Sequence, residues 1–75
     1  MKEENIIIAR IFLFCRQLLG LSQHKMAALL LVNQSTVNRI EKGALRPSDG
    51  LLRKLEEIIR LDMEQLFYLA TQQMG

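Results

Sequence analysis

The stretch GLSQHKMAALLLVNQSTVNRIEKGALRPS, residues 20–48, decides the fold. Its apolar residues recur at helical spacing in two short segments, residues 23–30 and 34–42. Ser22 and Asn33 directly precede these segments, and both residue types are favoured at the N-cap of a helix. The stretch therefore predicts two short helices that are joined by a tight turn.

The chain on either side of this stretch also has helical spacing, and no segment alternates as a strand would. Gly20 is suited to end a helix before the stretch, and Asp62 is suited to begin a new helix after it. These signals predict three further helices, over residues 4–19, 49–59 and 63–73. We therefore expect a compact, all-α domain of five helices that takes up residues 1–75.

Size and composition narrow the possible functions. The 75 residues are 49% hydrophobic and 24% charged, which is typical of a folded domain rather than a disordered chain. A chain of this length buries only about 60% of its unfolded surface, which leaves no room for a large enclosed active site. Phe and Tyr make up 5% of the residues and Trp is absent, so the sequence offers no aromatic platform for single-stranded nucleic acid.

The cellular compartment is indicated by what the sequence lacks. Cys15 is the single cysteine and cannot form an internal disulfide, which favours a reducing compartment. The apolar runs near the start are too short to span a bilayer, and the acidic start does not resemble a secretory signal. We expect a cytoplasmic protein without a membrane partner.

Charge is distributed unevenly along the chain. Residues 16–54 carry seven basic and two acidic side chains, a net charge of +5, whereas the remainder carries three basic and six acidic ones, a net charge of −3. A basic centre favours a surface that meets an anion, although a solvated charged face would give the same pattern. Within this centre, five polar residues share the face of helix 34–42 opposite to Val37 and Ile40: Gln34, Ser35, Asn38, Arg39 and Lys42. A helix that reads the major groove needs such a face, and ordinary solvent-exposed helices also have one.

The spacing of particular residues resembles the phage-repressor-like (Cro- or Xre-type) helix-turn-helix family. The resemblance covers residues 8–67 and rests on these matches: Arg16, Gly20-Leu21-Ser22-Gln23, Met26-Ala27, Leu30, Val32, Gln34-Ser35-Thr36-Val37, Arg39-Ile40-Glu41-Lys42-Gly43 and Arg46-Pro47-Ser48. It implies a five-helix, lambda-repressor-like fold with helix 34–42 in the major groove of duplex DNA. It further implies a prokaryotic or phage-encoded, sequence-specific transcription regulator of the repressor type.

The resemblance also implies roles for individual residues. The positions that match base contacts are Gln34, Ser35, Asn38 and Arg39. The positions that match phosphate contacts are Gln23, Asn33, Lys42 and Arg46. Arg16 and Glu41 match a salt bridge that joins the first helix to the end of the recognition helix. The chain departs from the family at Leu31 and Arg60, where glycine is usual, and a left-handed backbone at either would cost about 1 kcal/mol.

A second apolar stripe predicts assembly. Ile7, Ile11, Phe14 and Leu18 recur at helical spacing beside the core stripe of the first helix, and the last helix is rich in apolar residues. We expect a homodimer that reads a palindromic operator. The expected interface comprises Ile7, Ile11, Phe14, Leu18, Phe67 and Met74. The alternative is that the two surfaces pack against each other within one chain.

The sequence offers few of the residues that other classes of function would require. His24 and Cys15 are the only histidine and cysteine, and they fall on different faces of different helices, so we expect no enzyme, metal or cofactor. An antitoxin with the same DNA-binding domain, which would also bind a toxin or other protein antagonist, remains open. A helix-turn-helix used solely for protein contacts also remains open, and strongly salt-dependent duplex binding would argue against it.

Overall fold

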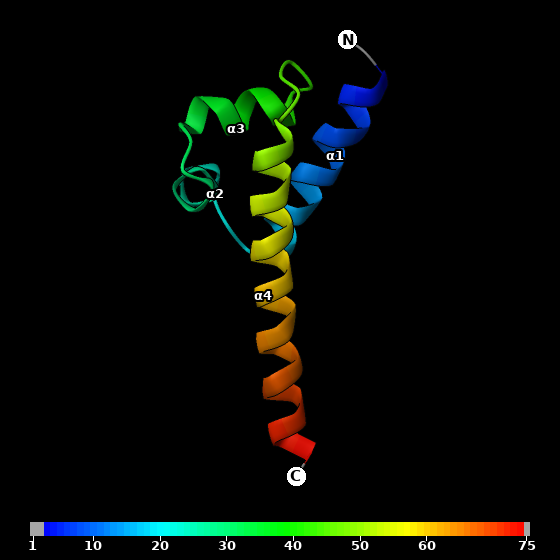
Figure 1. Cartoon of the computed structure of the whole chain (residues 1–75), viewed down its shortest axis with the longest axis vertical. Coiled ribbons are helices and arrows are strands. Elements are labelled where there is room, and N and C mark those ends of the chain that lie inside the picture. Colours follow the sequence, from blue (N-terminus) through cyan, green and yellow to red (C-terminus); the bar gives the residue numbers. More distant parts are fainter. Residues whose placement is uncertain (1–2, 75) are drawn as a thin grey trace.

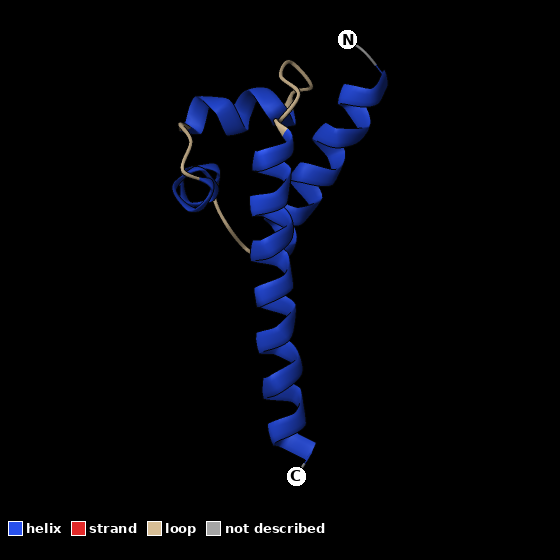
Figure 2. Cartoon of the chain, viewed as in Figure 1, coloured by secondary structure: helices blue, strands red, loops and turns tan. Residues whose placement is uncertain are grey.

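The structure of the chain is a computed structural model that describes the backbone of residues 3–74 and the side chains of residues 5–73. It has four helices, α1 (Glu3–Leu18), α2 (Gln23–Leu30), α3 (Gln34–Glu41) and α4 (Asp49–Met74), arranged as Figure 1 shows. Loops connect the helices, and no strand occurs between residues 3 and 74 (Figure 2). The prediction of an all-α fold is confirmed, whereas the count of five helices is wrong.

One hydrophobic core holds α1, α2, α3 and the first half of α4 together. Phe12 of α1 is buried against side chains of the other three helices, as expected of a single small domain. The remaining buried members of this core are Met26, Ala27, Leu30, Val37, Ile40, Leu51 and Leu55. The apolar faces that the sequence predicted for residues 23–30 and 34–42 are therefore the faces that pack.

The turns that frame α2 follow from local chemistry. The Ser22 hydroxyl accepts a hydrogen bond of 3.1 Å from the Lys25 amide, which caps the start of α2. Gly20 adopts a φ of 69°, the left-handed conformation that ends a helix at least cost in glycine. Asn33 occupies the N-cap of α3 as predicted, but its side chain makes no capping hydrogen bond.

The turn between α2 and α3 has a strained backbone at Leu31. This residue has φ 61° and ψ 42°, in the left-handed region that glycine would occupy more readily. Its side chain is 79% exposed, so little packing compensates for the strain. Leu31, one of the two positions at which the family usually has glycine, therefore does have a left-handed backbone.

The predicted break between residues 59 and 63 is absent, and α4 continues through it as one helix of 26 residues. Arg60 is helical rather than left-handed, so this departure from glycine causes no strain. Its guanidinium bonds the carboxylates of Glu57 and Glu64, three residues before and four residues after it. Such pairs stabilise a continuous helix, and Asp62 therefore lies inside α4 instead of capping a fifth helix.

The second half of α4 extends beyond the rest of the molecule (Figure 1). We call residues 60–74 the α4 tail; every side chain from Arg60 to Gln73 is exposed except that of Asp62, which is half-buried. The molecule measures 50 × 24 × 20 Å and has a radius of gyration of 13.9 Å. A compact chain of this length would have a radius of gyration of about 11 Å. The tail accounts for the difference.

Candidate nucleic-acid interface

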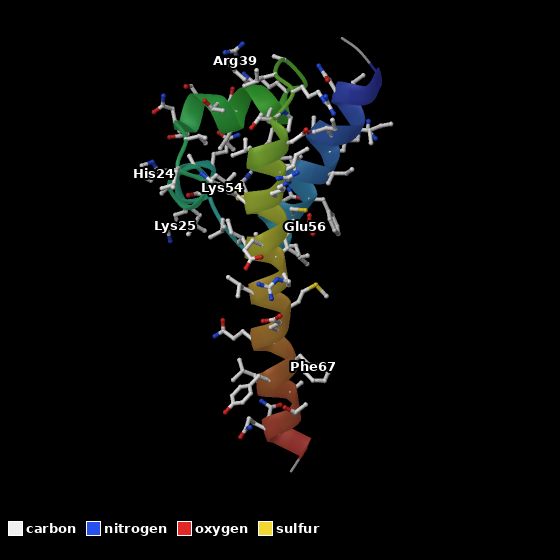
Figure 3. The ribbon with its side chains drawn as sticks, viewed as in Figure 1. His24, Lys25, Arg39, Lys54, Glu56 and Phe67 are labelled. Carbon is white, nitrogen blue, oxygen red and sulfur yellow. The ribbon has the colours of Figure 1, made fainter. Side chains whose placement is uncertain are left out.

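Helix α3 lies across the N-terminal end of α4 (Figure 1). One of its faces is buried in the core and the other is exposed. Val37 and Ile40 are fully buried, which fixes the rotation of the helix about its axis. The predicted base-contacting residues Gln34, Ser35 and Arg39 are exposed on the opposite arc. Arg39 points away from the α4 tail (Figure 3). This polar helix face at one end of the molecule is the surface predicted to contact DNA, and we call it the recognition surface.

An ion pair ties α3 to α1. Arg16 Nε lies 2.7 Å from Glu41 Oε2, and Arg16 Nη2 donates to Glu41 Oε1 at 3.1 Å. The two side chains are only 18% and 7% exposed. The hydrogen bond to Glu41 raises the pKa of Arg16, so the guanidinium stays charged throughout the physiological range. A two-pronged pair of this kind fixes the C-terminal end of α3 against the scaffold.

The same carboxylate also joins α2 to α3, through contacts that the sequence did not indicate. Gln23 Nε2 donates to Glu41 Oε1 at 3.1 Å, and Asn38 Nδ2 lies 3.5 Å from Gln23 Oε1. Gln23 and Asn38 are fifteen residues apart, so no local spacing signal could have found this contact. Both residues are half-buried and hold α2 and α3 in a fixed relation.

The N-terminal end of α2 carries a positive side chain, Lys25, whereas the cations Lys42 and Arg46 follow the C-terminal end of α3. His24 and Lys25 are exposed at the N-terminal end of α2 (Figure 3). Neither α2 nor α3 has an acidic residue in its first turn, so nothing there offsets the positive end of the helix dipole. The predicted phosphate-contacting residues Asn33, Lys42 and Arg46 are likewise exposed. Helix N-termini with nearby cations suit phosphate groups.

The predicted interface residues lie apart from this surface. Those of α1 are exposed on its outer side, and Phe67 is exposed in the α4 tail: Ile7, Ile11, Phe14, Leu18 and Phe67. The alternative in which these surfaces cover each other within one chain is therefore wrong. Met74 ends α4, but its side chain is outside the range that the structure describes.

The residues that the structure describes hold no metal-binding cluster. No group of three or more His, Cys, Asp or Glu side chains among them could bind a metal ion. Cys15 is half-buried beside the core, and burial raises the pKa of its thiol. Within residues 3–74 no individual helix is both long and apolar enough to cross a bilayer, although α1 and α2 taken as one bent pair meet the same criteria.

Comparison with known proteins agrees with this geometry. A helix-turn-helix family model of the Cro/C1 type matches residues 14–66, which include α2, α3 and the turn between them. No curated protein and no solved structure shows a significant match. The matched stretch takes up more than half of the chain and contains the complete recognition surface. The chain therefore belongs to the Cro/C1-type helix-turn-helix family of DNA-binding transcription regulators.

Proposed function

We propose that this protein is a repressor that binds a specific sequence in duplex DNA and places α3 in the major groove. The observation that carries the proposal is the anchoring of α3. Two buried apolar residues, the Arg16–Glu41 pair and the Gln23 bridge all fix this helix. Gln34, Ser35 and Arg39 on its polar face stay exposed. Groove readout requires a helix whose side chains are held at a constant depth and rotation.

The proposed contacts divide into two classes. Arg39 suits the two acceptors of guanine and Gln34 suits adenine, with Ser35 and Asn38 as further base contacts. Asn38 would have to leave or share its hydrogen bond with Gln23 to reach a base. Phosphates would be held by Lys42 and Arg46, by Asn33 at the start of α3, and by the amide end of α2 at Gln23. Gln23 would then contact both a phosphate and the Glu41 carboxylate.

We further propose that two copies bind a palindromic operator in the cytoplasm of a prokaryotic or phage-infected cell. Successive major grooves on one face of DNA are about 34 Å apart, and a two-fold pair of recognition helices matches two half-sites. Occupancy of such an operator would block transcription by exclusion. An antitoxin would use the same operator surface, and binding of a partner toxin to the exposed α4 tail would mark that alternative.

The decisive experiment is selection of binding sites from random duplex DNA, followed by fluorescence anisotropy on the selected site. We expect an enriched palindrome and an affinity at least 10³-fold above that for a scrambled duplex. Equal affinity for selected and scrambled duplexes would refute sequence-specific binding. Absence of any duplex binding would favour a protein-interaction module.

A further inference from the structure

We infer that a second copy of this chain covers the outer stripe of α1 and the side of the α4 tail that carries Met63 and Phe67, with the two α4 helices parallel. This inference rests on the proposed function, because it deepens the proposed homodimer by naming its surface and its orientation.

The solvent-accessible surface of the chain is larger than that of a compact monomer. The solvent-accessible surface is 5646 Å², whereas a compact monomer of this mass would expose about 4700 Å². The excess of roughly 900 Å² is close to the roughly 800 Å² that each partner buries in a stable interface of standard size. A single copy thus exposes about as much additional surface as one half of a dimer interface requires.

Part of the exposed apolar surface consists of the outer stripe of α1 and of Phe67 in the tail. Phe14 at the centre of the α1 stripe is 64% exposed, and Ile7, Ile11 and Leu18 are similarly exposed. In the tail, Phe67 is 74% exposed and points toward the side on which α1 lies (Figure 3). Met63, one turn before Phe67, lines a shallow hollow with it.

The end of α1 reaches α4 on a different side of the tail from Phe67. Leu19, which follows α1, lines a hollow with Ile58, Leu61 and Gln65 of α4, and Gln65 is about 160° from Phe67 around the helix. The outer stripe of α1 and the Phe67 side of the tail are therefore two apolar surfaces, and the second copy would have to cover both.

Parts of this surface are not included in the family match. The matched stretch, residues 14–66, excludes Ile7 and Ile11 at one end and Phe67 at the other. These side chains are not needed for the common core, because none of them is buried in it. All three are apolar and exposed, so they are available for contact with another chain.

The orientation follows from the position of α3. Helix α3 lies at the N-terminal end of α4, and Arg39 points away from the tail (Figures 1 and 3). Antiparallel tails would carry the two recognition helices to opposite ends of a rod, where one duplex could not meet both. Parallel tails place both helices at the same end, as a palindrome requires. The occupant is therefore a second copy related by a two-fold axis along α4.

Adjacent aromatic residues provide a matched test of this surface. Phe67 and Tyr68 are both exposed, but they lie about 100° apart around α4. We expect the wild type to sediment as a dimer at tens of micromolar without DNA. Phe67→Glu and Phe14→Glu should raise the dimer dissociation constant at least tenfold, while Tyr68→Glu leaves it within about twofold. Circular dichroism verifies that each variant remains helical.

A monomeric wild type would overturn the inference, whether or not the protein binds DNA. An equal increase of the dimer dissociation constant in Tyr68→Glu and Phe67→Glu would also overturn it, because the interface would then not be confined to the Phe67 side of the tail. Conversely, a dimer that fails to bind duplex DNA would refute the proposed function and leave the named surface in place. The two hypotheses therefore fail in different measurements.

Spin labels test the orientation. In a Cys15→Ala background, a nitroxide at Asp49→Cys reports the distance between the N-terminal ends of the two α4 helices. Antiparallel tails that overlap fully would separate the labels by about 50 Å, given the rise of an α-helix. Parallel tails should give less than about 34 Å, because α4 lies on the α1 side of α3 (Figure 1). A distance near 50 Å would refute the parallel arrangement.

Discussion

Glu41 is the residue on which the position of α3 depends most. Its two oxygens accept hydrogen bonds from Arg16 and Gln23, so one carboxylate connects α1, α2 and α3. Breaking one side of a buried pair costs about 3–5 kcal/mol, because the remaining charge loses its partner. We expect Glu41→Gln to lower the free energy of unfolding by an amount in the lower part of this range, since Arg16 retains some access to water. Urea denaturation measures the change.

Glu57→Gln is the matched control for that substitution. Glu57 also bonds an arginine, Arg60, but both side chains are about half exposed and the pair spans three residues of one helix. Exposed pairs contribute little to stability. The control should leave the urea midpoint almost unchanged. An equally small effect of Glu41→Gln would show that the Arg16–Glu41 pair is solvated in solution.

Substitutions of two cations, Arg39 in α3 and Lys42 directly after it, can distinguish base readout from phosphate binding. We expect Arg39→Ala to cost about 1–3 kcal/mol on the operator and to relax the preference at one base pair of each half-site. Lys42→Ala should weaken all duplexes alike and lower the salt dependence by about one unit for each copy. Anisotropy titrations on operator and scrambled duplexes measure both. An equal loss on both duplexes for Arg39→Ala would contradict its role in readout.

Cys15 gives the chain a pH dependence of stability. Burial raises the pKa of its thiol in the folded state, so the folded protein holds this proton more tightly than the unfolded chain does. The contribution of Cys15 to the free energy of unfolding is therefore fully present at neutral pH and is lost as the pH rises through the alkaline range. We expect Cys15→Ala to flatten the decline of the thermal midpoint above pH 8. An unchanged decline would assign it to other groups.

At the scale of elements, the turn between α2 and α3 stores strain that a single substitution can release. Leu31 is left-handed and exposed, so Leu31→Gly removes the strain and loses little packing. We expect a gain of about 1 kcal/mol, which corresponds to roughly 4–8 °C in thermal midpoint for a domain of this size. Leu29→Gly, an exposed leucine two residues earlier inside α2, should instead destabilise by about 1 kcal/mol. A lower midpoint for Leu31→Gly would mean that its side chain is held by contacts in solution.

The helices differ in how far the sequence determines them. Apolar spacing, Ser22 and the glycines sufficed to place α2 and α3, because local signals and tertiary packing agree there. The continuity of α4 could not be read in the same way. Asp62 is a good N-cap and is also tolerated inside a helix, so the choice depends on the Arg60 pairs and on the absence of a packed fifth helix.

The side-chain contacts around α3 could likewise be predicted only in part. The family resemblance placed Arg16 opposite Glu41, whereas the bridge through Gln23 to Asn38 joins residues that only the packed fold brings together.

At the scale of the whole molecule, charge and assembly combine in the salt dependence of DNA binding. In the proposed interface each copy contributes Lys42 and Arg46 as charged phosphate contacts, so the proposed dimer contributes four. Each neutralised phosphate contributes about −0.9 to the slope of log K against log salt. We expect a slope of about −4 for the wild type on a palindrome and about −2 for Phe67→Glu, which should bind as a monomer.

The charge that Phe67→Glu adds does not itself account for the smaller slope. Phe67 follows the first residue of α4, Asp49, by 18 residues, which is about 27 Å along the helix, or nearly three times the screening length of about 10 Å at 0.1 M salt. Tyr68→Glu adds the same charge at the same distance from α3 and should keep the slope of the wild type. Anisotropy titrations between 50 and 200 mM salt on the selected palindrome give all three slopes. Equal slopes for Phe67→Glu and the wild type would show that the second copy contributes no phosphate contacts.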